Sequence, residues 1–367
     1  MRSRFLVPLL ILAVAAAAQT PAKKYNPPRM ADGHPDLQGT YDAATLTPLE
    51  RRSGTALVMP KEEAAKLEAQ AVAVKQQGDK AIAGDRTAPP KGGDGSPGPA
   101  GNVGGYNIGW LDTGSSYNVV DGQKRASIII DPPDGRTPPL VPGRKAGESA
   151  YSFSIVGFLQ AAVNARPRPT SDQTESSDPG LERTPGAYDD PEARPLGERC
   201  LIGFGSTSGP PMLPNYFYNN NHQIVQTKDS VMILTEMVHD ARIVRMNAQH
   251  LPKNIRLWLG DSVGHWEGDT LVVDTTNFTD KTAFRGASPD LHVIERFTRE
   301  DAHTLLYRFT IDDPKTWTKP WTGEYSWPES KGPIYEYACH EGNYAMMDIL
   351  KGARIREKEQ AAKNGSK

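Results

Sequence analysis

From residue 219 to residue 339 the chain is a succession of short segments in which apolar and polar residues alternate, separated by turn sequences. The segments are rich in β-branched and aromatic residues, as half-buried antiparallel strands are. His265-Trp266 leads through Glu267-Gly268-Asp269 into the segment 270–278, which is a hairpin signal. With two similar segments nearer the N-terminus, roughly ten strands are expected. They are 37–41, 127–131, 223–227, 231–237, 242–246, 270–278, 293–299, 304–312, 322–327 and 334–339.

This spacing predicts a mainly β protein, either an antiparallel barrel that is lipocalin-like or a sandwich. An extended N-terminal arm precedes it, and short helices are expected over 60–78 and 344–356. Composition leaves open whether the Gly- and Pro-rich stretch 84–109 is a lid or a disordered loop. The expected organisation is a signal peptide over 1–18, an N-terminal arm, helix and loop over 19–110, a barrel-like domain over 111–345 with a long insertion at about 165–215, and a C-terminal helix and tail over 346–367.

The first 18 residues have the pattern of a cleavable export signal. Arg2 and Arg4 precede an uncharged apolar run that ends in four alanines at residues 15–18. A run of ~14 residues is shorter than the ~20 needed to cross a bilayer as a helix. The sequence therefore predicts cleavage after Ala18 and a periplasmic or secreted protein with no membrane span in its mature form.

Charge argues against nucleic acid as a partner. The chain has 42 Lys and Arg against 44 Asp and Glu, and loss of Arg2 and Arg4 with the signal moves the formal charge from −2 to −4. A nucleic-acid-binding domain carries a basic patch that this balance does not supply. The expected partner is a small-molecule or glycan ligand, and the sequence leaves the oligomeric state open.

The chain has two cysteines, Cys200 and Cys339. In an oxidising compartment an isolated pair most simply forms a disulfide. Two buried thiols and a shared place in a metal site are the alternatives, although neither cysteine lies in a C-x-x-C motif. A disulfide between them would close a very long loop.

Several long strings resemble a group of exported bacterial proteins, and the resemblance extends over most of the mature chain. They are the residues 31–39, 219–227, 236–242, 264–278 and 335–343, which include NNNHQIVQT, EMVHDAR, GHWEGDTLVVDTTNF and YEYACHEGN. We know of no established activity for that group. The resemblance therefore implies kinship, and it transfers no catalytic residues to this chain.

Strand alternation selects the candidate catalytic carboxylates. Glu295 shares a strand face with two large apolar neighbours, a costly position unless the carboxylate meets a cation or acts in a pocket. Glu336 shares a face with His340, and His239 lies beside Asp240. Imidazole beside carboxylate is the usual general base near neutral pH. These five residues are the predicted catalytic set.

Arg242 could bind an anionic substrate or neutralise the carboxylates of the predicted catalytic set. Of these two roles, a structural salt bridge is favoured.

The same side chains are also ligands for divalent metals, so a divalent metal is one candidate cofactor. The candidate ligands are His239, His265, His292 and His340, all near predicted strand ends. None of their spacings is a recognised metal signature. Ordinary capping and turn histidines are the alternative.

The leading hypothesis is an exported enzyme with histidine–carboxylate acid–base chemistry, acting as a lyase, isomerase or hydrolase on a small organic or sugar-like substrate, with metal help as an option. The alternative is a non-catalytic protein that binds an apolar, aromatic or glycan ligand in a barrel cavity. A structural envelope protein is a third class. The enzyme needs a histidine and a carboxylate within hydrogen-bond reach in a pocket, and the binding protein needs an aromatic-lined cavity.

Overall fold

The computed structural model describes residues 25–78, 112, 114–144, 186–203, 209–214, 218–281 and 284–365. The expected signal peptide, the stretch 84–109 and much of the expected insertion at 165–215 lie outside the described residues. In the described part of the chain, no helix is long and apolar enough to cross a membrane.

Twelve strands and two α-helices make up the regular structure of these residues, with short 3₁₀ turns between them. The strands are β1 (Gly39–Asp42), β2 (Val119–Val120), β3 (Gln123–Lys124), β4 (Ile129–Asp131), β5 (Asn221–Gln226), β6 (Ser230–Thr235), β7 (Asp240–Met246), β8 (Asp261–Glu267), β9 (Thr270–Thr276), β10 (His292–Arg299), β11 (Thr304–Asp312) and β12 (Trp321–Pro328). The helices are α1 (Lys61–Gly78) and α3 (Ala345–Gly365), and the 3₁₀ turns are η2 (Pro191–Ala193), η3 (Met237–His239) and η4 (Phe284–Gly286).

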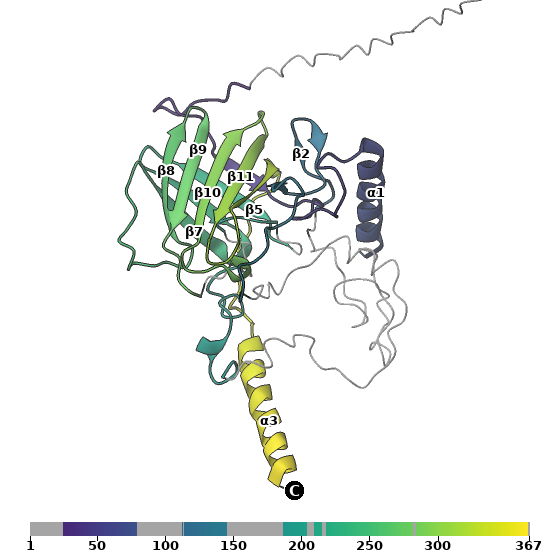
Figure 1. Cartoon of the computed structure of the whole chain (residues 1–367), viewed down its shortest axis with the longest axis vertical. Helices are drawn as coiled ribbons and strands as arrows, with labels where there is room; N and C mark the ends of the chain where they lie inside the picture. Colours follow the sequence, from purple (N-terminus) through teal and green to yellow (C-terminus); the bar gives the residue numbers. More distant parts are fainter. Residues whose placement is uncertain are drawn as a thin grey trace, which may run out of the picture.

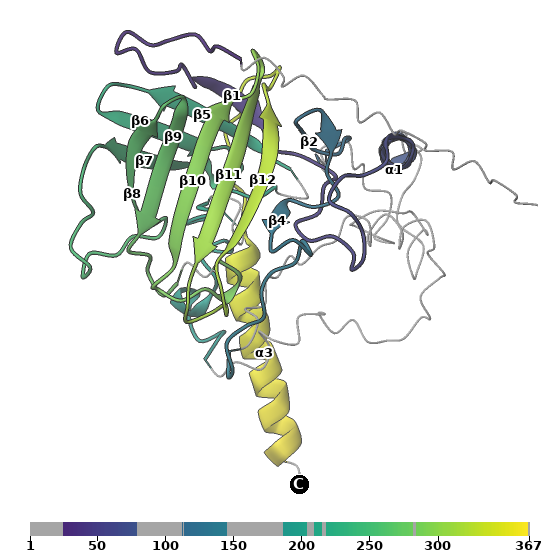
Figure 2. The same ribbon diagram turned by 45° about the horizontal axis from the view of Figure 1, so that its top comes forward.

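Ten strands form one curled sheet in the order β1-β5-β6-β7-β8-β9-β10-β11-β12-β4 (Figures 1 and 2). Neighbours run antiparallel except β7 and β8, which are parallel. The sheet curls until β1 meets the end of β12, where Tyr41 and Glu329 form a bridge and the Ser330 N–H donates to the Thr40 carbonyl at 2.8 Å. The predicted mainly β, barrel-like fold is confirmed.

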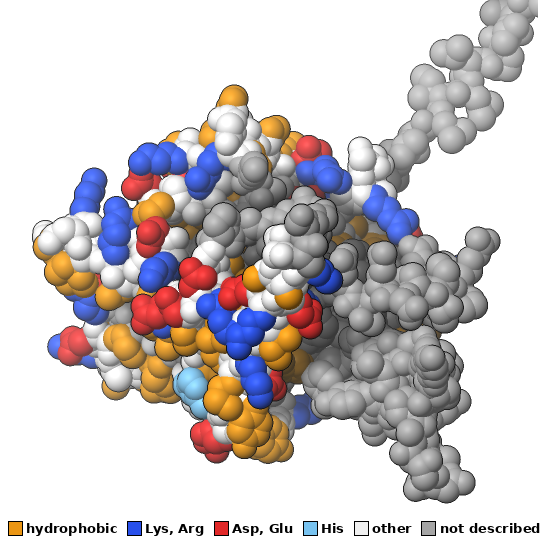
Figure 3. Space-filling model, turned by 90° about the horizontal axis from the view of Figure 1, so that it is seen from below, with side chains coloured by type: hydrophobic (Ala, Val, Ile, Leu, Met, Phe, Trp, Pro, Cys, Tyr) orange, Lys and Arg blue, Asp and Glu red, His pale blue; other side chains and the backbone are white. Residues whose placement is uncertain are grey.

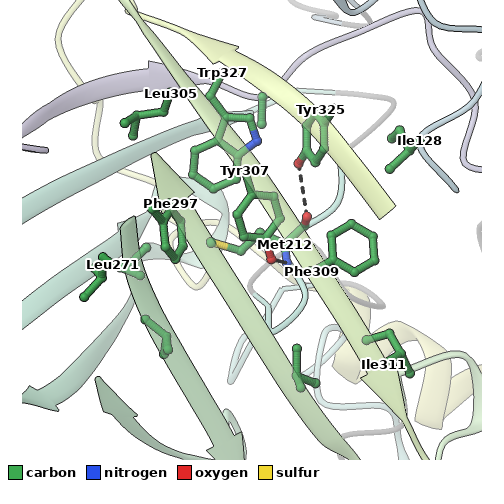
Figure 4. Close-up of a cluster of buried hydrophobic side chains, with 14 of the residues drawn as sticks. Ile128, Met212, Leu271, Phe297, Leu305, Tyr307, Phe309, Ile311, Tyr325 and Trp327 are labelled. Carbon is green, nitrogen blue, oxygen red and sulfur yellow. Dashed lines mark hydrogen bonds between the residues drawn. The ribbon is translucent and has the colours of Figure 1, made fainter. Parts of the chain in front are cut away.

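Alternation along the strands fills the interior of this sheet with aromatic rings. In β11, Leu305, Tyr307, Phe309 and Ile311 are all fully buried, while Arg308 between them is exposed. Strand β12 adds inward-facing rings, which pack edge-to-face and tilted against those of β10 and β11 (Figure 4). The interior is therefore packed through most of its length.

The N-terminal arm covers the outer face of β12. Asn118 Oδ1 accepts hydrogen bonds from the backbone N–H of Ser326 at 2.7 Å and from its hydroxyl at 2.6 Å. Helix α1 packs on the arm through a second, small cluster that includes Leu46, Ala64 and Tyr117. On the outer face of β12, Glu324 is therefore buried, while Thr322 and Ser326 remain partly exposed.

The predicted strand over 334–339 is wrong, since these residues have no strand structure. A strand here would need a free sheet edge beside β12. However, β11 and β4 flank β12, and β1 bridges to Glu329 just after it. The segment instead crosses the end of the barrel, and the closing helix α3 begins as predicted near 344 but continues to 365.

Candidate functional site

One end of the barrel, where β5 and β7 begin, is crossed by three stretches of chain that we call the cover: residues 200–203, 209–214 and 334–343. The predicted disulfide is present and joins two of them, with the Cα atoms of Cys200 and Cys339 5.7 Å apart. Helix α3 leaves the molecule from this end (Figures 1 and 2).

Two carboxylates of the barrel rim hold the cover by its backbone. Asp240 Oδ2 accepts the Gly203 N–H at 3.0 Å, and Glu236 Oε1 accepts the Tyr335 N–H at 3.1 Å. Both carboxylates lie at the connection between β6 and β7, which contains η3. Asp240, a predicted catalytic residue, therefore has a positioning role in this structure.

Beneath the cover lies a polar layer inside the otherwise apolar barrel. Its members come from seven consecutive strands of the sheet, and each is 4 % exposed or less. The polar layer consists of His222, Thr235, Arg242, Ser262, Thr275, Glu295 and Tyr307. Charged groups in such a position are expensive to desolvate and are weak evidence for stability alone.

A buried ion pair is the centre of the polar layer. Arg242 reaches across the barrel to Glu295 with both terminal nitrogens; Nη2 lies 2.9 Å from Oε1, and Nη1 contacts Oε2. The prediction that Glu295 needs a cation, and that Arg242 neutralises an acid, is confirmed. Ser262 and Thr275 continue the layer, with their hydroxyl oxygens 2.9 Å apart.

The cover enters the barrel at Met212, whose side chain is fully buried among the rings (Figure 4). The Tyr307 hydroxyl donates to Glu295 Oε1 at 2.8 Å and accepts the Met212 N–H at 3.0 Å. The Tyr325 hydroxyl donates to the Met212 carbonyl at 3.0 Å. The backbone of Met212 is thus hydrogen-bonded to two tyrosine hydroxyls in the barrel interior.

His222 is a neutral member of the polar layer. Burial, with a further contribution from the Arg242 charge, lowers the pKa of its imidazole to about 3. The ring stacks on Trp327 with centroids 4.7 Å apart, and Nδ1 lies 3.1 Å from Thr235 Oγ1. At any physiological pH this imidazole is uncharged and orients its neighbours through hydrogen bonding and stacking.

Three interior N–H donors have no acceptor among the described residues. They are Arg242 Nε, Trp321 Nε1 and Trp327 Nε1. Most buried donors in folded proteins are paired, so each such group calls for an explanation. Two of the three belong to or touch the polar layer, because Trp327 stacks on His222.

A second group of polar side chains lies on the outer face of β8, β9 and β10. His250 Nδ1 lies 3.0 Å from Asp261 Oδ2, and His250 Nε2 lies 3.1 Å from Asp274 Oδ1. His292 Nε2 lies 2.9 Å from the same Asp274 oxygen. These contacts link Asp261, His250, Asp274 and His292 in a partly exposed network. Through His250, the network attaches the loop between the parallel strands β7 and β8 to the outer face of the sheet.

In this outer group, hydrogen-bonded partners favour the charged forms of His292, Asp274 and Asp261. The hydrogen bond to Asp274 raises the pKa of His292, against an opposing effect of burial. Burial alone would raise the pKa of Asp274, but hydrogen bonds from His292 and His250 and their charges outweigh it, so the pKa is lowered. The same balance, with a backbone N–H and Arg245 as donors, lowers the pKa of Asp261.

The outer group makes stability depend on pH in a definite direction. The pKa of His292 in the folded protein lies above its ordinary value of 6.5. The contribution of protonated His292 to the free energy of unfolding is therefore complete below pH 6.5, and it is lost as the pH rises through the folded-state pKa. His292→Gln is therefore expected to flatten the fall in unfolding free energy above about pH 6.5. Urea titrations at a series of pH values measure this. His239→Gln, at an exposed histidine, is the matched control; equal slopes in both variants would contradict the assignment.

The predicted catalytic set is not brought together. Glu295 is buried in the polar layer, whereas Glu336, His340 and His239 are exposed on the cover and on η3. Asp240 accepts its hydrogen bond from the cover backbone.

The candidate metal ligands are also dispersed. His239, His265 and His340 are exposed on η3, β8 and the cover, and His292 contacts Asp274 on the outer face. Within the described ranges no group of three or more His, Cys, Asp or Glu side chains is arranged to hold a metal ion.

Sequence reasoning missed His250 and Met212. His250 lies in a loop, 11 and 24 residues from its two carboxylate partners, so no local spacing links them. Met212 acts through its backbone, which carries no sequence signal. His222 and Tyr307 were detectable, since each alternates with apolar residues on an inward strand face.

No protein-family model, curated protein or solved structure matches this chain. Its function is therefore argued from its own geometry.

Proposed function

We propose that this chain is an exported binding protein for a small molecule with an apolar or aromatic body and a hydrogen-bond-accepting group, held at the covered end of the barrel. The observation that carries the proposal is the buried polar layer with unpaired donors at Arg242 Nε and Trp327 Nε1. Both atoms are donors only, so their complement is an acceptor such as a carbonyl or carboxylate. The surrounding rings supply the apolar contact that small-molecule sites usually have.

Met212 indicates where such a ligand would lie. Its peptide N–H and carbonyl engage the Tyr307 and Tyr325 hydroxyls, and its side chain fills the space between the rings. A ligand with a polar group and an apolar body makes the same kinds of contact. Binding would therefore displace Met212 and the cover segment 209–214, exchanging one set of contacts for another.

Binding is favoured over catalysis because the pKa values of the histidine and the tyrosine of the polar layer are shifted away from neutral pH. The pKa of His222 is lowered to about 3, and burial raises the pKa of Tyr307 well above its ordinary value. Glu295 is held by Arg242. A general acid or base works best with a pKa near the operating pH.

Acid–base catalysis remains a second candidate, and the contact between Asp274 and His292 favours it. The carboxylate orients the imidazole through Nε2 and raises its pKa, as in a general-base pair. Both side chains are about one-third exposed, at 35 % and 34 %. However, neither side chain lines the pocket beside the disulfide or the pocket beside α1, two pockets of the described part of the chain.

The test of the binding proposal is a titration with anilinonaphthalene sulfonate, an aromatic anion that fluoresces in apolar sites. Met212→Ala removes the side chain that the ligand must displace, so probe affinity should rise by about tenfold, equivalent to ~1.4 kcal/mol. Met232→Ala, on the half-exposed outward side of β6, is the matched control and should bind as the unmodified protein does. Equal affinity in all three proteins, with folding verified by circular dichroism, would contradict the proposal.

A further inference from the structure

A pocket of about 450 Å³ lies on the outside of the molecule beside the disulfide, separate from the polar layer. It opens between the segment that ends at Cys200 and the tail that leads into α3, and its lining includes Glu198, Tyr218, Glu336 and Tyr337. Figure 3 views the molecule from the end at which α3 projects, where acidic, basic and apolar side chains are intermixed. The volume is within the range of small-molecule sites, ~300–1,000 Å³.

Two aromatic rings give this disulfide pocket a defined wall. Tyr218 and Tyr337 are stacked, with centroids 6.3 Å apart and planes inclined by 17°. Tyr218 precedes β5, and Tyr337 lies two residues before Cys339, so the disulfide constrains the chain next to the second ring. Ring faces carry negative electrostatic potential and attract cations.

The charge of the lining has one sign. Among its described lining residues only Glu198 and Glu336 are charged, and none of these residues is Lys, Arg or His. Arg194 already holds Glu198, with Nε 2.9 Å from Oε2 and Nη2 3.0 Å from Oε1. Glu336 is exposed and has neither an ion pair nor a hydrogen bond to its side chain within the described ranges. The pocket therefore carries one uncompensated negative charge beside two rings.

We propose that the disulfide pocket binds a small organic ammonium ion, with Glu336 as its counter-ion and Tyr218 and Tyr337 against its alkyl groups. This site does not depend on the barrel-interior function, because no member of the polar layer lines it. A neutral glycan would donate hydroxyl groups to the carboxylate but leave its charge uncompensated, whereas an ammonium ion neutralises it.

Choline and its neutral isostere dimethylbutanol are the probes, titrated by calorimetry into the full-length mature protein. They have nearly the same shape and differ in charge, so the difference in affinity isolates the electrostatic contribution. We expect saturable binding of choline and much weaker binding of the isostere. Glu336→Gln should weaken choline binding by about threefold to tenfold, and Tyr337→Leu should weaken it similarly.

Glu341→Gln is the matched control, because Glu341 is an exposed glutamate of the same segment outside the pocket lining. It should leave choline binding unchanged. Absence of saturable choline binding, equal affinity for the isostere, or equal losses in the two glutamine variants would overturn the proposal. Preferential binding of a neutral disaccharide would overturn it as well, in favour of a glycan site. Thermal unfolding of each variant separates lost binding from lost folding.

Discussion

Arg242→Met is expected to lower the free energy of unfolding by about 3–5 kcal/mol, one of the two largest effects that the structure predicts. The change leaves Glu295, which is fully buried, without its partner inside the barrel. An unpaired buried carboxylate must either remain charged at a high desolvation cost or take up a proton. Urea unfolding near neutral pH measures the loss.

Two further variants distinguish this explanation from a general effect of losing an arginine. The double variant Arg242→Met, Glu295→Leu removes both charges, so it should recover much of the lost stability. Arg296→Gln breaks the ion pair between Arg296 and Glu267, whose side chains are 39 % and 49 % exposed, and should cost far less than Arg242→Met. If Arg242→Met cost no more than Arg296→Gln, the buried pair would not have the energetic role assigned to it.

The double variant Cys200→Ala, Cys339→Ala is expected to lower the free energy of unfolding by about 2–5 kcal/mol. The disulfide joins residues 139 positions apart, and a cross-link across a long loop restricts the unfolded chain strongly. Its loss should also loosen the cover, so that anilinonaphthalene sulfonate reaches the barrel end more readily. Urea unfolding and probe titration measure the two effects.

The unmodified protein, reduced with a thiol reagent, is the control for the cysteine variant, because it loses the cross-link and keeps the side chains. It should match the variant in both measurements. Unchanged stability in both samples would contradict a stabilising disulfide. Lower stability with unchanged probe binding would mean that the disulfide stabilises the fold but does not hold the cover over the barrel end.

Most of the sheet could be predicted from the sequence because each strand carries its own signal. The alternation of Leu305, Tyr307, Phe309 and Ile311 defines both a strand and its inward face. The same logic placed Glu295 among apolar neighbours and so predicted its cation. The segment 334–339 has the same alternation, yet it is not a strand, because pairing depends on a free edge, which is a property of the whole sheet.

The site was less predictable because its geometry depends on contacts between distant segments. The spacing of Glu336 and His340 would place them on one face of a strand. Because residues 334–339 do not form a strand, these two side chains do not lie beside Glu295. The parallel pairing of β7 and β8 requires a long crossing loop, and that loop brings His250 to Asp274. No local pattern contains this information.

The central claim, that a ligand enters the barrel end where Met212 now lies, is tested most directly by methyl nuclear magnetic resonance of methionine-labelled protein. The Met212 methyl group is fully buried among aromatic rings, so ring currents should shift its resonance away from that of exposed methionines. On titration with anilinonaphthalene sulfonate, this resonance should move with the same concentration dependence as the fluorescence, while that of Met232 stays in place. A Met212 resonance that does not move while the probe binds would contradict it.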